Sequence, residues 1–128
     1  MLDEAAIQER IAKRTAAKVA RDFALADSIR KDLLAQAKRG EVIVLDVRPQ
    51  EEYDTAHLPY ARSMPLPELA QRMAELSRDV EIVAYCRGPF CLMSDEAVKL
   101  LQARGYRARK TFDGVSEWQA AGLPVKRA

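Results

Sequence analysis

Cys86 and Cys91 are the only cysteines of the 128-residue chain, and they stand five positions apart within the sequence AYCRGPFCLM. The run Glu81–Tyr85 before them is rich in β-branched and aromatic residues, which is typical of a buried strand. Residues 92–104 after them carry apolar side chains at helical spacing and are followed by Gly105, which indicates a helix with a glycine cap. The sequence therefore predicts a thiol at the end of a strand, on a loop that leads into a helix.

This placement favours a reactive thiol. Unpaired backbone N–H groups at a helix start carry partial positive charge and attract anions, and successive amides in a tight loop add further donors. We expect a cysteine there to ionise to a thiolate, with the charge of Arg87 acting in the same direction. The alternative is a small apolar side chain in the core, the usual role of a free cysteine. We predict Cys86 as the nucleophile, in an active-site loop made of Arg87, Gly88, Pro89, Phe90, Cys91 and Leu92.

Four segments together resemble a single rhodanese domain over residues 41–125, most closely the kind fused to ArsR-type repressors. The resemblance implies an α/β fold of three α/β/α layers around a central, mainly parallel sheet. It also implies a sulfurtransferase that carries sulfur as a persulfide on Cys86. The matching segments are VLDVR at 44–48 with EEY at 51–53, HLPYA at 57–61, the Cys86 loop, and DGVSEW at 113–118 with GLPV at 122–125.

The same resemblance assigns roles to further residues. It implies that Asp46 and Arg48 support the active-site loop through hydrogen bonds and an ion pair, and that His57 is structural. Cys91 departs from the Arg, Lys or Ser found at this loop position in many thiosulfate-using rhodaneses, which puts thiosulfate preference in question. Cys91 is a candidate resolving thiol that would take sulfur from Cys86 or form a disulfide with it, and the alternative is that it packs under the helix.

The implied reaction moves a sulfane sulfur from thiosulfate or a persulfide or polysulfide donor to a thiol acceptor, either a small thiol or a thioredoxin-like protein. Two other functions are compatible with the loop. One is a non-catalytic sulfur-sensing or protein-interaction module. The other is a thiol-based arsenate reductase or phosphatase, although the loop from Cys86 to Cys91 has the rhodanese length and the related phosphatases use a longer one.

The first forty residues differ from the rest because they contain no proline and are dense in alanine, lysine and arginine, which favours helix. We predict a helical hairpin over residues 1–39, broken near Asp22, whose second helix merges into a rhodanese domain over 40–128. Residues 11–33 are similar to the helical stretch near the C-terminus of cysteinyl-tRNA synthetases, which would imply a cysteine-linked or tRNA-linked role. We favour the alternative of a generic hairpin that shields the sheet or supports a dimer.

Composition adds several exclusions. The net charge of +2 is too small to indicate a nucleic-acid partner, and the single histidine argues against a metal site. Two cysteines five positions apart cannot staple a fold. The N-terminal sequence lacks a signal-peptide pattern, and no segment is apolar enough to span a membrane. We therefore expect a cytoplasmic protein that needs neither a cofactor nor a membrane.

Overall fold

The computed structural model describes residues 22–88 and 90–128. The chain divides into two compact units, residues 1–32 and residues 33–128. A helix covers residues 22–38, and the expected first helix of the hairpin lies outside the described residues. Within the second unit, Leu33 is buried, and Leu34 and Ala37 pack beside it against one face of the sheet. The end of this helix therefore belongs to the core of the second unit.

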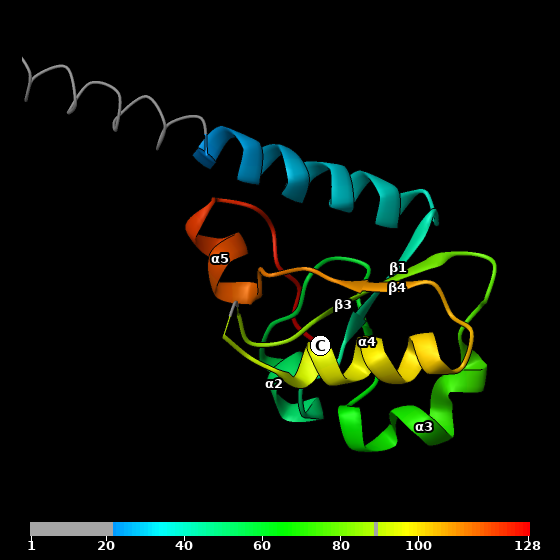
Figure 1. Cartoon of the computed structure of the whole chain (residues 1–128). Coiled ribbons are helices and arrows are strands. Elements are labelled where there is room, and N and C mark those ends of the chain that lie inside the picture. Colours follow the sequence, from blue (N-terminus) through cyan, green and yellow to red (C-terminus); the bar gives the residue numbers. More distant parts are fainter. Residues whose placement is uncertain (1–21, 89) are drawn as a thin grey trace, which may run out of the picture. The chain divides into compact units, whose positions relative to one another are not determined.

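The second unit is built on a four-stranded parallel sheet with the strand order β2-β1-β3-β4 (Figure 1). This confirms the predicted parallel α/β architecture. The two long strands lie at its centre, where apolar runs are expected, whereas the two-residue edge strand has no apolar pattern and escaped prediction. The strands are β1 (Val42–Asp46), β2 (Arg62–Ser63), β3 (Glu81–Tyr85) and β4 (Ala108–Lys110).

The connections between the strands contain the remaining helices. Pro49 precedes α2 with its φ already near the helical value, as is common at helix starts. The helix α4 ends before Gly105, whose φ of 86° is the left-handed conformation expected of a C-terminal cap. The helices are α2 (Gln50–Thr55), η1 (Leu66–Glu68), α3 (Leu69–Arg72), η2 (Met73–Glu75), α4 (Met93–Ala103) and α5 (Val115–Ala120).

Side chains of the central strands alternate between two hydrophobic cores, because successive residues of a strand point to opposite faces. On β3, Ile82 and Ala84 enter the core beneath α3 and α4, and Val83 and Tyr85 enter the core that contains Trp118 of α5. Cys86 continues the first series and lies in the α4-side core. The strand pattern thus determines the direction in which the thiol points.

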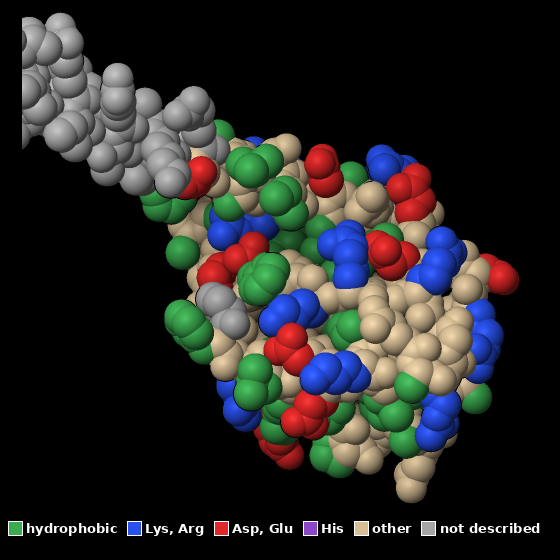
Figure 2. Space-filling view, viewed as in Figure 1, with side chains coloured by type: hydrophobic (Ala, Val, Ile, Leu, Met, Phe, Trp, Pro, Cys, Tyr) green, Lys and Arg blue, Asp and Glu red, His purple; other side chains and the backbone are tan. Residues whose placement is uncertain are grey.

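Charged groups of both signs are interspersed on the face shown in Figure 2. On β4, for example, Arg109 pairs with Glu81 at 2.7 Å and Lys110 pairs with Asp95 at 2.8 Å. No helix among the described residues has the length and apolar character needed to cross a membrane.

Candidate active site

Cys86 directly follows β3 and is 2% exposed. Its Sγ lies 3.3 Å from the hydroxyl of Ser94, a buried residue in the first turn of α4, and 3.4 Å from the carbonyl oxygen of Cys91. A hydroxyl both donates and accepts, so Ser94 accepts from the thiol and would donate to a sulfur anion after a rotation. The strand end therefore presents the Cys86 thiol to polar groups at the start of α4.

Cys91 is the more exposed of the two free thiols. Burial by itself would raise the pKa of the Cys91 thiol, but a hydrogen bond with Cys86, the backbone N–H groups of Arg87 and Met93, and the charge of Arg87 lower this pKa below its ordinary value. The sequence predicted that the loop amides would act on Cys86. Instead, the amide of Arg87 in the loop and that of Met93 at the start of α4 act on Cys91, and the Cys86 Sγ lies 3.4 Å from the carbonyl oxygen of Cys91.

Arg87 ties the loop to α2. Its Nε and Nη2 atoms donate to the two carboxylate oxygens of Glu52 at 2.8 and 2.7 Å, a bidentate arrangement. The Arg87 guanidinium holds the pKa of the Glu52 carboxyl below its usual range. Sequence reasoning missed Glu52 as a loop-holding residue because it precedes Arg87 by 35 positions.

Asp46 and Arg48 form a buried ion pair at the end of β1, with the shortest N–O distance 2.7 Å. The Tyr85 hydroxyl donates to Asp46 at 2.7 Å and accepts from the backbone N–H of Leu58 at 3.1 Å, and Arg48 also donates to the carbonyl oxygen of Ala56. Burial, aided by the Asp46 carboxylate, raises the pKa of the Tyr85 hydroxyl well above its ordinary value. The pair thus holds the residue that precedes Cys86, and these contacts reach β3 rather than the loop amides.

Two glycines allow close approach around the loop. A Cβ on Gly114, just before α5, would lie 2.8 Å from the carbonyl oxygens of both Cys86 and Arg87, which are backbone atoms that cannot swing aside. A Cβ on Gly88 would lie 2.9 Å from Oε1 of Glu117. The start of α5 therefore packs directly against the active-site loop. The sequence did not indicate that Gly114 permits this close contact.

His57 makes its contacts elsewhere in the unit. Its ring stacks on Tyr53 with centroids 3.8 Å apart, its Nδ1 lies 2.9 Å from the carbonyl oxygen of Tyr53, and its backbone pairs with that of Lys126. Tyr60, three residues later, has a φ of 65°, so a tyrosine adopts the left-handed conformation that glycine usually occupies. Among the described residues, no group of three or more His, Cys, Asp or Glu side chains is placed to hold a metal ion.

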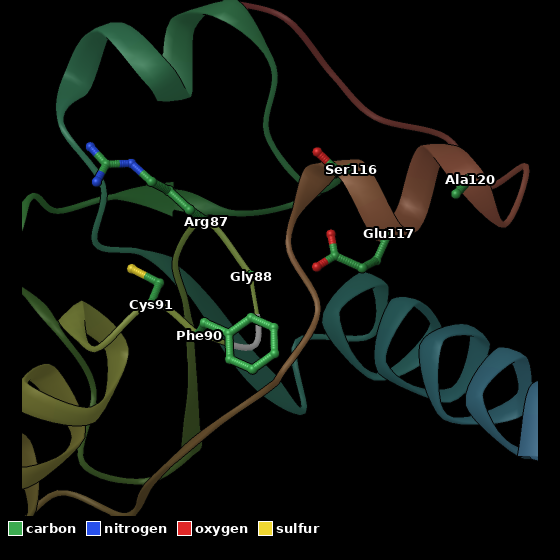
Figure 3. A pocket seen from close by; sticks show the side chains of 7 residues that line it. All are labelled: Arg87, Gly88, Phe90, Cys91, Ser116, Glu117 and Ala120. Atoms are coloured by element: carbon green, nitrogen blue, oxygen red, sulfur yellow. The ribbon is translucent and has the colours of Figure 1, made fainter.

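A cavity of about 480 Å³ opens beside the loop. Figure 3 shows Arg87 and Cys91 on one side of Gly88, with Ser116, Glu117 and Ala120 of α5 on the other. The Phe90 side chain is almost fully exposed at the rim. Cys91 is therefore the thiol that lines the cavity, with Cys86 in contact behind it. The lining residues are Arg87, Gly88, Phe90, Cys91, Ser116, Glu117 and Ala120.

A parallel α/β sheet with a cysteine-bearing loop between β3 and α4 defines a class of α/β proteins that place a cysteine between a strand end and a helix start. A family model described as the rhodanese-like domain matches residues 30–121. This chain belongs to the rhodanese-like domain family, as its motifs predicted.

Relatives and solved structures agree with this assignment. The chain is 48% identical over 96 residues to the HTH-type transcriptional regulator Rv0324 of Mycobacterium tuberculosis, covering 75% of this chain and 42% of the regulator. It is 30% identical over 86 residues to a protein named sulfurtransferase from Allochromatium vinosum, covering 66% of this chain and 78% of that protein. A rhodanese-related protein from Thermoplasma volcanium has a similar structure, with a TM-score of 0.67 at 26% identity over 77% of this chain and 95% of that one.

The second resemblance also has a counterpart, but a short one. A cysteine–tRNA ligase from Acidovorax ebreus is 71% identical over 35 residues, which is 27% of this chain and 8% of the ligase. The chain also spans less than half the length of the mycobacterial regulator.

Proposed function

We propose that this chain is a sulfurtransferase that moves a sulfane sulfur from thiosulfate or from a persulfide or polysulfide donor to a thiol acceptor, through a persulfide on Cys86. Membership of the rhodanese-like family and the relatives named sulfurtransferase support a sulfurtransferase-type function in general. The observation that carries the finer proposal is the Cys86 thiol at the end of β3, whose Sγ lies 3.3 Å from the Ser94 hydroxyl and 3.4 Å from the carbonyl oxygen of Cys91, the second thiol of the loop.

In the first step, the Cys86 thiolate attacks the outer sulfur of the donor. The sulfur–sulfur bond of the donor breaks, its electron pair leaves on sulfite or on a thiolate, and Cys86 keeps one extra sulfur. Ser94 lies within reach of the sulfur at 3.3 Å and would donate a hydrogen bond to the anion. An acceptor thiolate then attacks the outer sulfur of the persulfide and regenerates the Cys86 thiolate, which gives ping-pong kinetics.

Cys91 would act in the second half of this cycle. The Cys86 Sγ lies 3.4 Å from the carbonyl oxygen of Cys91, Cys91 lines the cavity, and its lowered pKa favours the thiolate that an attacking sulfur needs. Attack on the outer sulfur would carry the sulfur to Cys91, whereas attack on the inner sulfur would form a Cys86–Cys91 disulfide and release hydrosulfide. Neither route requires an external oxidant, because the sulfane sulfur of the donor is already at the oxidation level of a persulfide.

The test is mass spectrometry of the native protein and of the Cys86→Ser and Cys91→Ser variants after exposure to thiosulfate or polysulfide. We expect a gain of about 32 Da, one sulfur atom, on Cys86 in the native protein and in Cys91→Ser. The Cys86→Ser variant should gain none. A gain of native extent on Cys86→Ser would show that another residue is the nucleophile and would overturn the mechanism.

A second function, a sulfur-sensing module without turnover, is favoured by the 48% identity to a protein named as a transcriptional regulator. A sensor would load sulfur on the same thiol once and hold it. Repeated turnover with added thiol acceptor supports the enzyme, and stoichiometric loading with no release supports the sensor.

A further inference from the structure

The cavity beside Cys91 is lined by a carboxylate as well as by a cation, although the proposed donors include small sulfur anions. Its lining contains two charged side chains, Arg87 and Glu117, and the rest consists of small, aromatic or thiol groups. Phe90 and Ala120 supply apolar surface to the lining of the cavity. The charge that a donor meets in this cavity therefore depends on what neutralises these two groups.

Arg87 is already neutralised. Both oxygens of Glu52 accept from its guanidinium at 2.7–2.8 Å, so its charge and two of its donors are engaged by α2. A small dianion at the cavity would compete with a bidentate carboxylate for this cation.

Glu117 is in the opposite situation. Its Oε2 is shielded from water and makes no hydrogen bond within the described part of the chain. Its Oε1 stands against the backbone at Gly88, and the carboxylate points toward the loop in Figure 3. A carboxylate oxygen that is neither hydrated nor paired acts through a lower local dielectric than one in water, so Glu117 repels an approaching anion more strongly than a fully exposed carboxylate does.

We propose that this cavity favours persulfides whose sulfur is carried on an uncharged or cationic organic group, and that Glu117 slows loading from small dianionic donors such as thiosulfate without preventing it. This inference rests on the proposed sulfurtransferase function and narrows its donor class. The apolar surface of Phe90 and Ala120 receives the carbon part of the donor, and the carboxylate of Glu117 attracts an ammonium group on it.

The transfer balances without a further reactant. The Cys86 thiolate attacks the outer sulfur of a persulfide, R–S–SH, and the sulfur–sulfur bond breaks with its electron pair on the inner sulfur. The thiolate RS⁻ takes the proton of the transferred sulfur and leaves as RSH, while Cys86 becomes a persulfide anion. The leaving group is a neutral thiol rather than sulfite, so no new anion forms beside Glu117.

The experiment compares three donors of graded charge: thiosulfate, 2-hydroxyethyl persulfide and 2-aminoethyl persulfide. Loading of Cys86 is followed by mass spectrometry for the native protein and for Glu117→Gln, which keeps the shape and removes the charge. Glu75→Gln is the matched control, because it removes one carboxylate from an exposed position that does not line the cavity. Taking the variant-to-native ratio for each donor cancels the intrinsic reactivity of the donors.

For Glu117→Gln we expect the loading rate with thiosulfate to rise roughly tenfold, the rate with 2-aminoethyl persulfide to fall several-fold, and the rate with 2-hydroxyethyl persulfide to stay within about twofold. Glu75→Gln should leave all three ratios near one. A misfolded variant would lower all three rates together, so opposite changes cannot arise from lost structure.

Equal ratios for the three donors in Glu117→Gln would overturn the assignment of donor choice to Glu117 and leave the sulfurtransferase standing. Failure of every donor to load Cys86 in the native protein would instead overturn the proposed function, and this inference with it.

Discussion

Because Gly114 has no side chain, the loop that carries the Cys86 thiol can pack directly against its backbone. The carbonyl oxygens of Cys86 and Arg87 both lie 2.8 Å from the point where a Cβ would stand. Real Cβ atoms essentially never approach other atoms this closely, so any other residue must push the peptide after Cys86 away. The thiol contacts with Ser94 and Cys91 depend on that peptide staying in place.

We expect Gly114→Ala to lower the free energy of unfolding by about 1–3 kcal/mol, the usual cost of overpacking, and to slow sulfur loading of Cys86 more than tenfold. Gly122→Ala is the matched control, since its site has open space but a φ of 76°. Backbone strain should cost that variant about 1 kcal/mol of stability without slowing the loading. Chemical denaturation and mass spectrometry measure the two effects, and equal loading rates in both variants would contradict the role given to Gly114.

For single residues, the sequence predicts where a residue lies in the fold better than it predicts the direction of its side chain or backbone N–H group. The position of Cys86 at a strand end follows from the apolar run before it and the helical pattern after it. The direction of the amides of Arg87 and Met93, toward Cys91, depends on loop dihedral angles that no local pattern specifies. The left-handed φ of Tyr60 could not be predicted from residue preferences either, because tyrosine rarely adopts this conformation.

At the scale of elements, the bidentate pair between Glu52 of α2 and Arg87 of the loop joins two segments that the sequence separates by 35 positions. Periodicity predicted α4, yet it carries no information on which side chains of separate elements meet. The four-residue α3 lies between two short 3₁₀ turns that local periodicity does not predict either. Pro65 precedes the first of these turns and Pro67 lies within it, while Leu69 and Met73 are buried in the core.

The Glu52–Arg87 pair predicts a pH dependence. Arg87 lowers the pKa of Glu52 from its ordinary 4.5, so the unfolded state binds more protons than the native state as acid is added. The stabilising contribution is therefore complete above pH 4.5 and is lost as the pH falls through the folded-state pKa. We expect the native protein to be more stable than Glu52→Gln above pH 5 and the gap to close toward pH 3, in denaturation curves at low salt. A gap that does not change with pH would show that the charge of Glu52 contributes nothing.

At the scale of the whole rhodanese-like unit, the buried hydrogen-bond network of Asp46, Arg48 and Tyr85 connects several elements. It joins β1 to β3 and reaches the segment between α2 and β2 through the backbone at Ala56 and Leu58. The motif containing Asp46 and Arg48 was visible in the sequence, but its third member belongs to the strand before Cys86, where a tyrosine looks like an ordinary core residue. The network thus fixes Tyr85, the residue adjacent to the proposed nucleophile, relative to β1.

Removing one hydroxyl tests this network across the pH range. Tyr85→Phe leaves an oxygen of Asp46 and the N–H of Leu58 without this partner, so we expect a loss of about 2–3 kcal/mol in the free energy of unfolding near neutral pH. Burial raises the folded-state pKa of Tyr85 above its ordinary 10.0, so the native tyrosine keeps its proton at pH values where the unfolded chain loses it. The native protein therefore loses stability as the pH rises above 10, and phenylalanine, which cannot ionise, escapes that loss. Denaturation of both proteins between pH 7 and 11 should show the gap constant up to about pH 9.5 and narrowing above it. A gap that stays constant through pH 11 would mean that Tyr85 ionises as easily in the folded protein as in the unfolded chain, and that the buried network does not hold its proton.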